Sequence, residues 1–250
     1  MRPHHSRYWL NPNHDNEEKF VENTKEVGEI YLEAPEAALN GRRTVGTDEK
    51  TGIQAPERKY PTKTMKPGKP ERIEFEYIRH GTLSLIASFD VVTGRILSPC
   101  IGGTRSEQDF CQHIRKVISS DPQAKEWVFV ADQLNIHKSE SLVRLVDELC
   151  GLEKELGVKG KSGILKSMES RADFLKDRTH SIRFLYTPKH CSWLNQIEIW
   201  FGILTKKLLK RGNFGSKETL RDNLINFIEY FNKNIARPYR WTFDGLPLKA

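Results

Sequence analysis

Three acidic residues occupy positions where a simple solvated carboxylate is not expected. Asp48 ends the first candidate strand, and Asp132 ends the most apolar strand of the chain. Glu198 lies beside the apolar stripe of a candidate helix, with Leu194 and Phe201 as its i−4 and i+3 neighbours. Burying a carboxylate is costly unless it is paired or binds a metal. These side chains are therefore the first candidates for chemistry.

The chemistry that suits three such carboxylates is metal-assisted phosphoryl transfer. In an open sheet, ligands gather at the carboxyl ends of strands, which fits Asp132 directly and Asp48 if the two strands are adjacent. Converging carboxylates repel one another unless a cation is present. Mg²⁺ binds through a few carboxylates, waters and substrate phosphates. Two ions about 4 Å apart can activate a water and stabilise the leaving oxygen in phosphodiester cleavage.

Other acidic residues compete for these roles. Glu49 adjoins Asp48, and neighbours on a strand point to opposite faces, so only one of them can face the site. Asp90 and Asp109 also lie near the ends of candidate elements. The alternative role for Asp132 is to cap the helix that follows it.

The elements that must position these residues are read from hydrophobic periodicity. We expect a helix over 15–35 that Pro35 and the Gly41 region end, then antiparallel strands, then alternating helices and strands. Ser106 and Ser139 are the expected N-caps of two helices, and Gly151 stops the second. The expected strands are 42–49, 73–78, 83–90, 95–100, 126–132 and 182–187. The expected helices are 106–120, 139–150, a helix whose apolar stripe runs from Leu194 to Leu208, and 216–232. This order predicts an α/β fold with a mixed sheet flanked by helices.

Charge and composition narrow the class of protein. The formal net charge is +7, and residues 151–250 carry 19 Lys and Arg against 10 Asp and Glu. A basic half of this kind favours a polyanionic partner, most often nucleic acid. No apolar run reaches the roughly 18 residues of a membrane helix, and no signal peptide opens the sequence. The four cysteines form no Cys-x-x-Cys pair. We expect a cytoplasmic protein without membrane partners.

Several long motifs resemble the IS630 group of bacterial transposases, which is related to the Tc1/mariner elements. They are TDEKTGIQAPER, YIRHGTLSLIASFDVVTG, FVADQLNIHKSESLV and YTPKHCSWLNQIEIWFGILTKKLLKRGNF, followed by YFNKNIARPYRWTFDG. They occur in the family's order, and the resemblance covers about residues 5 to 250. It implies an RNase H-like fold and a DDE endonuclease active in DNA transposition, a recombination reaction of mobile elements.

The resemblance also implies the site and its partners. The Asp of TDEKTG is Asp48, the Asp of VADQLNIHKS is Asp132, and the Glu of SWLNQIEIWF is Glu198. This triad would hold two Mg²⁺ ions, for which Mn²⁺ substitutes. DNA is the implied partner, as transposon ends and as target DNA with TA dinucleotides, and a homodimer is the implied active form. The alternative for Glu198 is a buried salt bridge with Arg183 or Lys189.

Further side chains are expected around the triad. Asn135, His137 and Asn195 are candidates for hydrogen bonds that support the carboxylates, although a purely structural histidine is an open alternative for His137. The candidate DNA contacts follow the Glu198 helix: Lys206, Lys207, Lys210 and Arg211. Cations at a helix C-terminus also interact favourably with its dipole, so their location has a second explanation.

The chain departs from the family pattern in three places. The second motif has Asp132-Gln133 where many relatives have Asp-Asn, and 66 residues separate Asp132 from Glu198, a longer spacing than usual. Residues 1–40 are expected to be a helical or linker segment, the end of a missing helix-turn-helix region. The catalytic domain is expected over 41–250, with an insertion at about 151–180. The alternatives are an inactive remnant that binds DNA non-specifically and a general RNase H-like nuclease.

Overall fold

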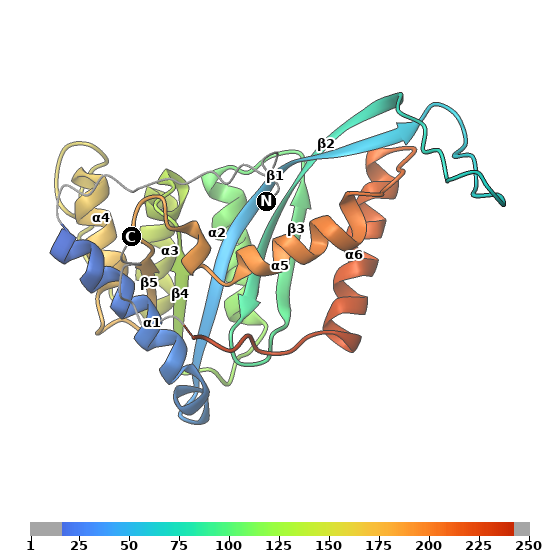
Figure 1. The fold of residues 1–250 in the computed structure, drawn as a ribbon. Helices are drawn as coiled ribbons and strands as arrows, with labels where there is room; N and C mark the ends of the chain where they lie inside the picture. The colour runs from blue at the N-terminus through green and yellow to red at the C-terminus, as the bar shows by residue number, and fades with distance from the viewer. Residues whose placement is uncertain (1–16, 243–250) are drawn as a thin grey trace.

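The computed structural model describes residues 17–242, which form one layered α/β unit (Figure 1). The strands are β1 (Arg42–Arg58), β2 (Tyr77–Asp90), β3 (Ile96–Gly102), β4 (Glu126–Ala131) and β5 (Ile182–Tyr186). The helices are α1 (Glu17–Leu39), α2 (Glu107–Ser119), α3 (Glu140–Cys150), α4 (Met168–Lys176), α5 (Ile197–Leu204) and α6 (Lys217–Asn234). Shorter 3₁₀ turns cover Asn135–Lys138, Ile164–Lys166 and Ser192–Leu194, and a π-helical turn, Thr205–Leu209, continues α5.

The five strands form a mixed sheet in the order β3-β2-β1-β4-β5. β1 is antiparallel to β2, and β2 is antiparallel to β3. β1 is parallel to β4, and β4 is parallel to β5. The predicted mixed sheet is therefore confirmed, with β1 at the boundary between its antiparallel and parallel halves.

Helices cover both faces of the sheet (Figure 1). On one face, α2, α3 and α4 pack on residues such as Val45, Phe129 and Phe184. On the other face, α5 and α6 pack against β1 to β3, and α1 packs against β4 and β5. Alternate residues of β4 supply both cores, since Phe129 belongs to the first cluster and Val128 to the α1 cluster. Burial on both faces explains why this strand is so apolar.

Local signals fixed the ends of two helices as predicted. The Ser106 hydroxyl accepts the Asp109 N–H and forms a capping box at the start of α2. The Ser139 hydroxyl accepts the Leu142 N–H at the start of α3. Gly151 ends α3 in the left-handed region at φ 61°.

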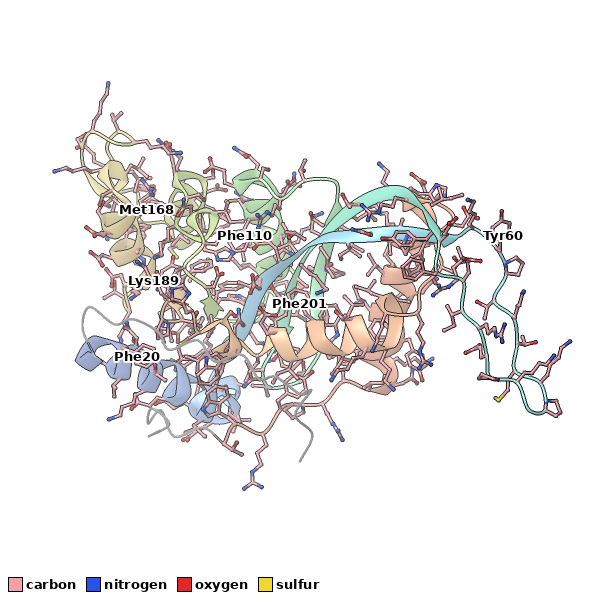
Figure 2. All side chains as sticks on the ribbon, turned by 45° about the horizontal axis from the view of Figure 1, so that its top comes forward. Phe20, Tyr60, Phe110, Met168, Lys189 and Phe201 are labelled. Atoms are coloured by element: carbon pink, nitrogen blue, oxygen red, sulfur yellow. The ribbon has the colours of Figure 1, made fainter. Side chains whose placement is uncertain are left out.

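The first strand differs from its prediction. β1 does not end at Glu49 but continues to Arg58, because β2 pairs with it as far as Arg58 opposite Tyr77. The two strands leave the body as a long arm, and Tyr60 lies on it away from the packed side chains around Phe201 (Figure 2). Of the strand predicted at 73–78, only its last two residues belong to β2.

Two helices also differ from their predictions. α1 continues through Pro35 and ends at Leu39, and Tyr31 and Ala34, in the turn just before the proline, are buried. Packing of this kind outweighs the backbone hydrogen bond that proline cannot make. The apolar spacing of the last helix predicts a buried face of Leu220, Leu224, Phe227 and Phe231, but in α6 the buried stripe contains Ile228 and Phe227 is only partly buried.

The segment after α6 returns across the molecule to α1 (Figure 1). Tyr239 stacks on Phe89, with ring centroids 4.7 Å apart. Trp241 then contacts Tyr31 of α1, with centroids 4.8 Å apart. This return segment therefore ties the first helix to the far end of the described chain.

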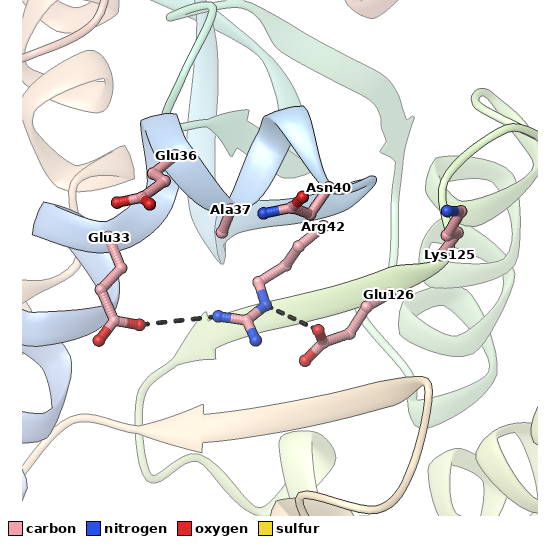
Figure 3. Close-up of a pocket in the computed structure, with 7 residues that line it drawn as sticks. All are labelled: Glu33, Glu36, Ala37, Asn40, Arg42, Lys125 and Glu126. Atoms are coloured by element: carbon pink, nitrogen blue, oxygen red, sulfur yellow. Dashed lines mark hydrogen bonds and ion pairs between the residues drawn. The ribbon is translucent and has the colours of Figure 1, made fainter.

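A hollow of about 370 Å³ lies between α1 and the first residues of β1 and β4 (Figure 3). Arg42 crosses it, with one nitrogen 2.7 Å from Glu126 and another 3.7 Å from Glu33. It lies at the amino ends of the parallel strands, opposite the edge where Asp132 is found, so it is separate from the predicted site. Within residues 17–242, no helix is long and apolar enough to cross a membrane.

Candidate active site

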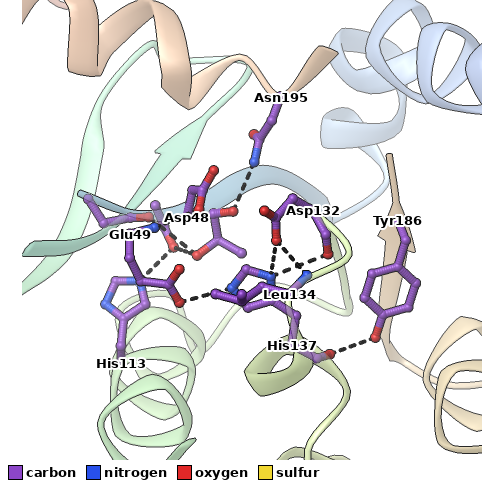
Figure 4. Close-up of polar contacts among 11 residues, drawn as sticks. Asp48, Glu49, His113, Asp132, Leu134, His137, Tyr186 and Asn195 are labelled. Atoms are coloured by element: carbon purple, nitrogen blue, oxygen red, sulfur yellow. Dashed lines mark hydrogen bonds and ion pairs between the residues drawn. The ribbon is translucent and has the colours of Figure 1, made fainter. Parts of the chain in front are cut away.

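Strand register brings two of the predicted acids together. β1 and β4 are parallel, with Gly46 opposite Val130. Asp48 and Asp132 each lie two residues beyond this pair, at the carboxyl end of the parallel segment (Figure 4). Asp48 is only 6% exposed. The sheet thus places both carboxylates at the edge where open α/β sheets bind ligands.

A buried histidine links Asp132 to Glu49. His137 Nδ1 lies 2.8 Å from Asp132 Oδ1, and Nε2 lies 3.0 Å from Glu49 Oε1 (Figure 4). Ionised carboxylates can only accept, so both ring nitrogens donate and the ring is an imidazolium. Burial lowers the pKa of His137, but its bonds to Asp132 and Glu49 outweigh burial and raise this pKa to about 10.

The two aspartates differ in their electrostatics. Burial, followed by repulsion from Asp132, raises the pKa of Asp48 to about 7. Burial also acts to raise the pKa of Asp132, but the hydrogen bond and charge of His137 and the Leu134 N–H outweigh it and lower this pKa. The Glu49 N–H donates to Asp48 Oδ1 at 2.7 Å. Asp132 is therefore the fixed anion of the pair, and Asp48 is the carboxylate that a neighbouring cation would stabilise most.

The donor set suits a hard divalent cation. Ligand atoms of Asp48, Asp132 and His137 lie within 4.8 Å of one another. Both nitrogens of His137 are already bonded to carboxylates, which leaves the aspartate oxygens as donors. Repulsion between two carboxylates at one site is what a bound divalent ion would relieve. The residues present thus fit Mg²⁺ or Mn²⁺.

Glu198 feels the charge of this site but is not part of the cluster. It lies in the first turn of α5 and is half-buried; burial raises its pKa, Lys50 lowers it, and the charge of Asp132 raises it again. Glu198 forms no ion pair within 4.0 Å among the described residues. Arg183, one of the two alternative partners, instead binds Glu126 at 3.1 Å. Glu198 therefore lies within the electrostatic reach of Asp132 without touching either aspartate.

Asn195 fixes the start of the helix that carries Glu198. Its side-chain Nδ2 donates to the Thr47 backbone carbonyl at 2.9 Å, and the Asn195 backbone carbonyl accepts the Glu198 N–H at 3.0 Å. The side chain is fully buried. Gly46 makes room for it, because a Cβ at Gly46 would lie 2.5 Å from Asn195 Oδ1. Asn195 thus connects the strand that bears Asp48 to the helix that bears Glu198.

This contact gives a first prediction. The Gly46→Ala substitution should displace Asn195 and the first turn of α5, destabilise the fold by about 1–3 kcal/mol and reduce any activity that needs Glu198. Denaturant unfolding would measure the change in free energy. The matched control is Gly202→Ala in α5, since a Cβ at Gly202 meets nothing within 4 Å. It should stabilise the protein by up to about 1 kcal/mol. Equal stability of the two variants would contradict the role given to Gly46.

The remaining predicted residues make no hydrogen bond or ion pair with Asp48, Asp132 or Glu198 among the described contacts. Asn135 is exposed at the start of a 3₁₀ turn, and the amide beside Asp132 is that of Gln133, which donates to the Thr187 carbonyl at 2.8 Å. The four predicted DNA contacts are all exposed along and after the π-helical turn: Lys206, Lys207, Lys210 and Arg211. Asp90 and Asp109 accept nearby backbone N–H groups in a turn and at a helix N-terminus, so they serve local structure.

Sequence reasoning missed two contacts of the site: the influence of Lys50 on Glu198 and the bond between Glu49 and His137. Lys50 Nζ lies 5.8 Å from the centre of the Phe201 ring, close enough to Glu198 to lower its pKa. The signal was present in the order Asp48-Glu49-Lys50. Period-two alternation puts the first and third residues on one face of the strand and Glu49 on the other.

The chain matches the model of the DDE superfamily endonuclease family over residues 43–221. Its fold is similar to that of the Mos1 transposase paired-end complex with left transposon end, with a TM-score of 0.54 and 15% sequence identity. The superposition covers 90% of this chain and 59% of the Mos1 chain. For the Mos1 mariner paired end complex with Mn, the TM-score is 0.53 at 15% identity and the same coverage. It is also similar to the catalytic domain of Mos1 mariner transposase (TM-score 0.50, 12% identity), with 90% of this chain and 93% of that chain covered.

These likenesses, at low identity, confirm the RNase H-like fold. The chain spans about three fifths of the length of the Mos1 chains in the paired-end complexes. No curated protein sequence matches it. The family model covers more than half of the chain and includes Asp48, Asp132 and Glu198. The chain therefore belongs to the DDE superfamily of endonucleases.

Proposed function

We propose that this chain is the catalytic part of a DDE transposase of the IS630 type. It would hydrolyse a phosphodiester at the end of a mobile element and then join the freed 3′-OH to target DNA at a TA dinucleotide. The observation that carries the proposal is the convergence of Asp48 and Asp132 at one sheet edge, with Glu198 of α5 within the electrostatic reach of Asp132. The DDE family match and the likeness to Mos1 structures support it.

Asp48, Asp132 and Glu198 would hold two divalent ions, Mg²⁺ in the cell with Mn²⁺ as a substitute. When bound, the ions would activate the attacking oxygen and stabilise the leaving oxygen. The chain's own residues would set the geometry. His137 orients the Asp132 carboxylate through its Nδ1–H, and Asn195 fixes the turn that presents Glu198. No covalent intermediate is needed, so no nucleophilic serine, tyrosine or cysteine is assigned.

DNA would lie across the carboxyl edge of the sheet. The exposed cations after α5 are the proposed phosphate contacts on one side of the site: Lys206, Lys207, Lys210 and Arg211. Salt-dependent binding is expected from such contacts. We assign the catalytic domain to residues 41–250, with the inserted segment at about 151–180. We propose a homodimer as the active form.

A strand-transfer assay tests this function. The purified chain is incubated with DNA duplexes that carry a free 3′-OH, supercoiled plasmid and Mg²⁺ or Mn²⁺, and joined products are counted. Metal-dependent joining supports the proposal. DNA binding without nicking or joining under any divalent ion would identify an inactive remnant. Cleavage of the RNA strand in RNA–DNA hybrids, with no action on DNA, would identify a general RNase H-like nuclease.

A further inference from the structure

A second group of cations lies on the other side of Asp132. Lys138 ends the 3₁₀ turn after β4, Lys176 ends α4, and Lys189 lies in the loop after β5. None of the three has a carboxylate within 4.0 Å among the described residues. Lys138 Nζ lies 4.7 Å from the centre of the Tyr186 ring, and Lys176 Nζ lies 5.8 Å from it. Lys138 and Lys176 therefore direct their ammonium groups toward the Tyr186 ring, and Lys189 follows that tyrosine by three residues in the chain.

The three charges act on one another and on the candidate active site. Burial, followed by repulsion from Lys176 and Lys189, lowers the pKa of Lys138. Asp132 acts in the opposite direction and raises it. Lys138 is therefore close enough to Lys176 and Lys189 to be repelled by both, and close enough to Asp132 to be attracted by its carboxylate. An anion placed among them would relieve this repulsion.

A hydrogen-bonded frame holds this corner in place. Gln133 accepts from Lys138 Nζ and donates to the Thr187 carbonyl. The Tyr186 hydroxyl donates to the His137 carbonyl at 2.7 Å. Arg171 is 8% exposed and donates from Nε to the Lys138 carbonyl at 2.6 Å. Lys138 is the cation that this frame holds, so its side chain loses little conformational entropy when it binds a ligand.

The position of the cluster indicates what it binds. Lys189 lies on the α4 side of the body, whereas Phe201 lies toward the arm (Figure 2). The cations after α5 thus flank the acids on the arm side, and the lysine cluster flanks them on the β5 side. A polyanion that crosses the acids would meet both groups. A duplex presents phosphates along its whole length, so it can satisfy two separate cationic surfaces at once.

We infer that Lys138, Lys176 and Lys189 form a phosphate subsite that holds the DNA backbone next to the phosphodiester at Asp132. The inference rests on the proposed function, because it takes DNA as the substrate. It adds a contact surface on the β5 side that is independent of Lys206 to Arg211. Each lysine would contact one phosphate and release about one counterion on binding.

DNA binding measured without divalent ions tests this subsite. Fluorescence anisotropy of a labelled duplex of about 30 base pairs gives Kd over a range of salt concentrations. The K138Q/K176Q/K189Q variant should bind roughly tenfold or more weakly at 0.1 M salt. The slope of log affinity against log salt should become shallower by about 2–3. The matched control, K25Q/K161Q/K166Q, removes three exposed lysines elsewhere and should leave the slope near that of the unmodified chain.

Equal slopes in the two triple variants would overturn the subsite, since net charge alone would then explain binding. The single variant K189Q guards against misfolding, because Lys189 is an exposed loop residue; its expected slope change is about 1. The outcomes separate the two proposals. A slope effect without metal-dependent joining would leave the subsite standing and remove the transposase function. Joining with an unchanged slope would remove the subsite alone.

Discussion

Replacing Asp132 with asparagine is expected to reduce metal-dependent DNA cleavage by at least about 10³-fold. A correctly held metal ion contributes several kcal/mol to such reactions, and each 1.4 kcal/mol corresponds to about tenfold in rate. Asp132 is the carboxylate whose anionic form is favoured by His137 and the Leu134 N–H, so it should be the strongest single ligand. Nicking of supercoiled plasmid over time measures the effect.

Asp48→Asn and Glu198→Gln should cause losses of the same order, whereas Asp90→Asn, toward the other edge of the sheet, should not. The Asp90 carboxylate accepts the Val92 N–H at 2.9 Å, a bond that an asparagine oxygen can also accept. Asp90 is as buried as Asp48, which makes it a matched control. Full activity of the Glu198→Gln variant would remove Glu198 from the triad and leave a two-aspartate site.

Replacing Asp48 with asparagine is also expected to stabilise the protein at alkaline pH. Its pKa rises from 3.8 in the unfolded chain to about 7 in the fold, chiefly because the carboxylate is buried. Between these values the folded chain keeps a proton that the unfolded chain has released, so stability falls as pH rises through this window. The full difference corresponds to about 4 kcal/mol. The variant should gain this amount above about pH 7 and almost nothing near pH 4.

Urea unfolding at pH 4.5 and pH 8 measures this gain, and Asp109→Asn is the control of opposite sign. Hydrogen bonds from Ser106 and Thr104 lower the pKa of Asp109, so its loss should destabilise α2. Added Mg²⁺ should raise the stability of the unmodified chain and not that of the Asp48→Asn variant, because an ion that binds only the folded state stabilises it. A gain that does not depend on pH would show that burial of charge at Asp48 is not its cause.

Much of the fold could be predicted because local signals and tertiary packing agree. Ser106, Ser139 and Gly151 carry caps that depend on a few neighbouring residues, and the apolar run before Asp132 fits a strand buried on both faces. The length of β1 could not be predicted, because its second half depends on pairing with a strand about thirty residues away. Pro35 was expected to help end α1 but lies inside it, because burial of Ala34 outweighs the low helix propensity of proline.

The candidate site was predictable in its aspartates and less so in its surroundings. Asp132 follows from its position just after a strand, whereas Asp48 lies within β1 and was expected at its end; the register of β1 and β4 brings the two together where their pairing stops. Glu198 depends on where a helix begins, and that point is set by Asn195 reaching Thr47, a contact between residues far apart in the chain. Lys50 was missed because one lysine in a polar segment has no distinctive pattern until the face of the strand is known.

The contact between Tyr31 and Trp241 has a consequence for the order of folding. The two rings are separated by nearly the whole described chain, so closing that loop is entropically expensive and belongs among the slow, non-local steps. During synthesis, α1 leaves the ribosome early, but this contact cannot form until residue 241 has emerged. Within the described residues, α1 is thus synthesised before the strands it covers but gains its contact with Trp241 only after them, so the apolar side of β4 and β5 is covered by an incompletely anchored helix until then.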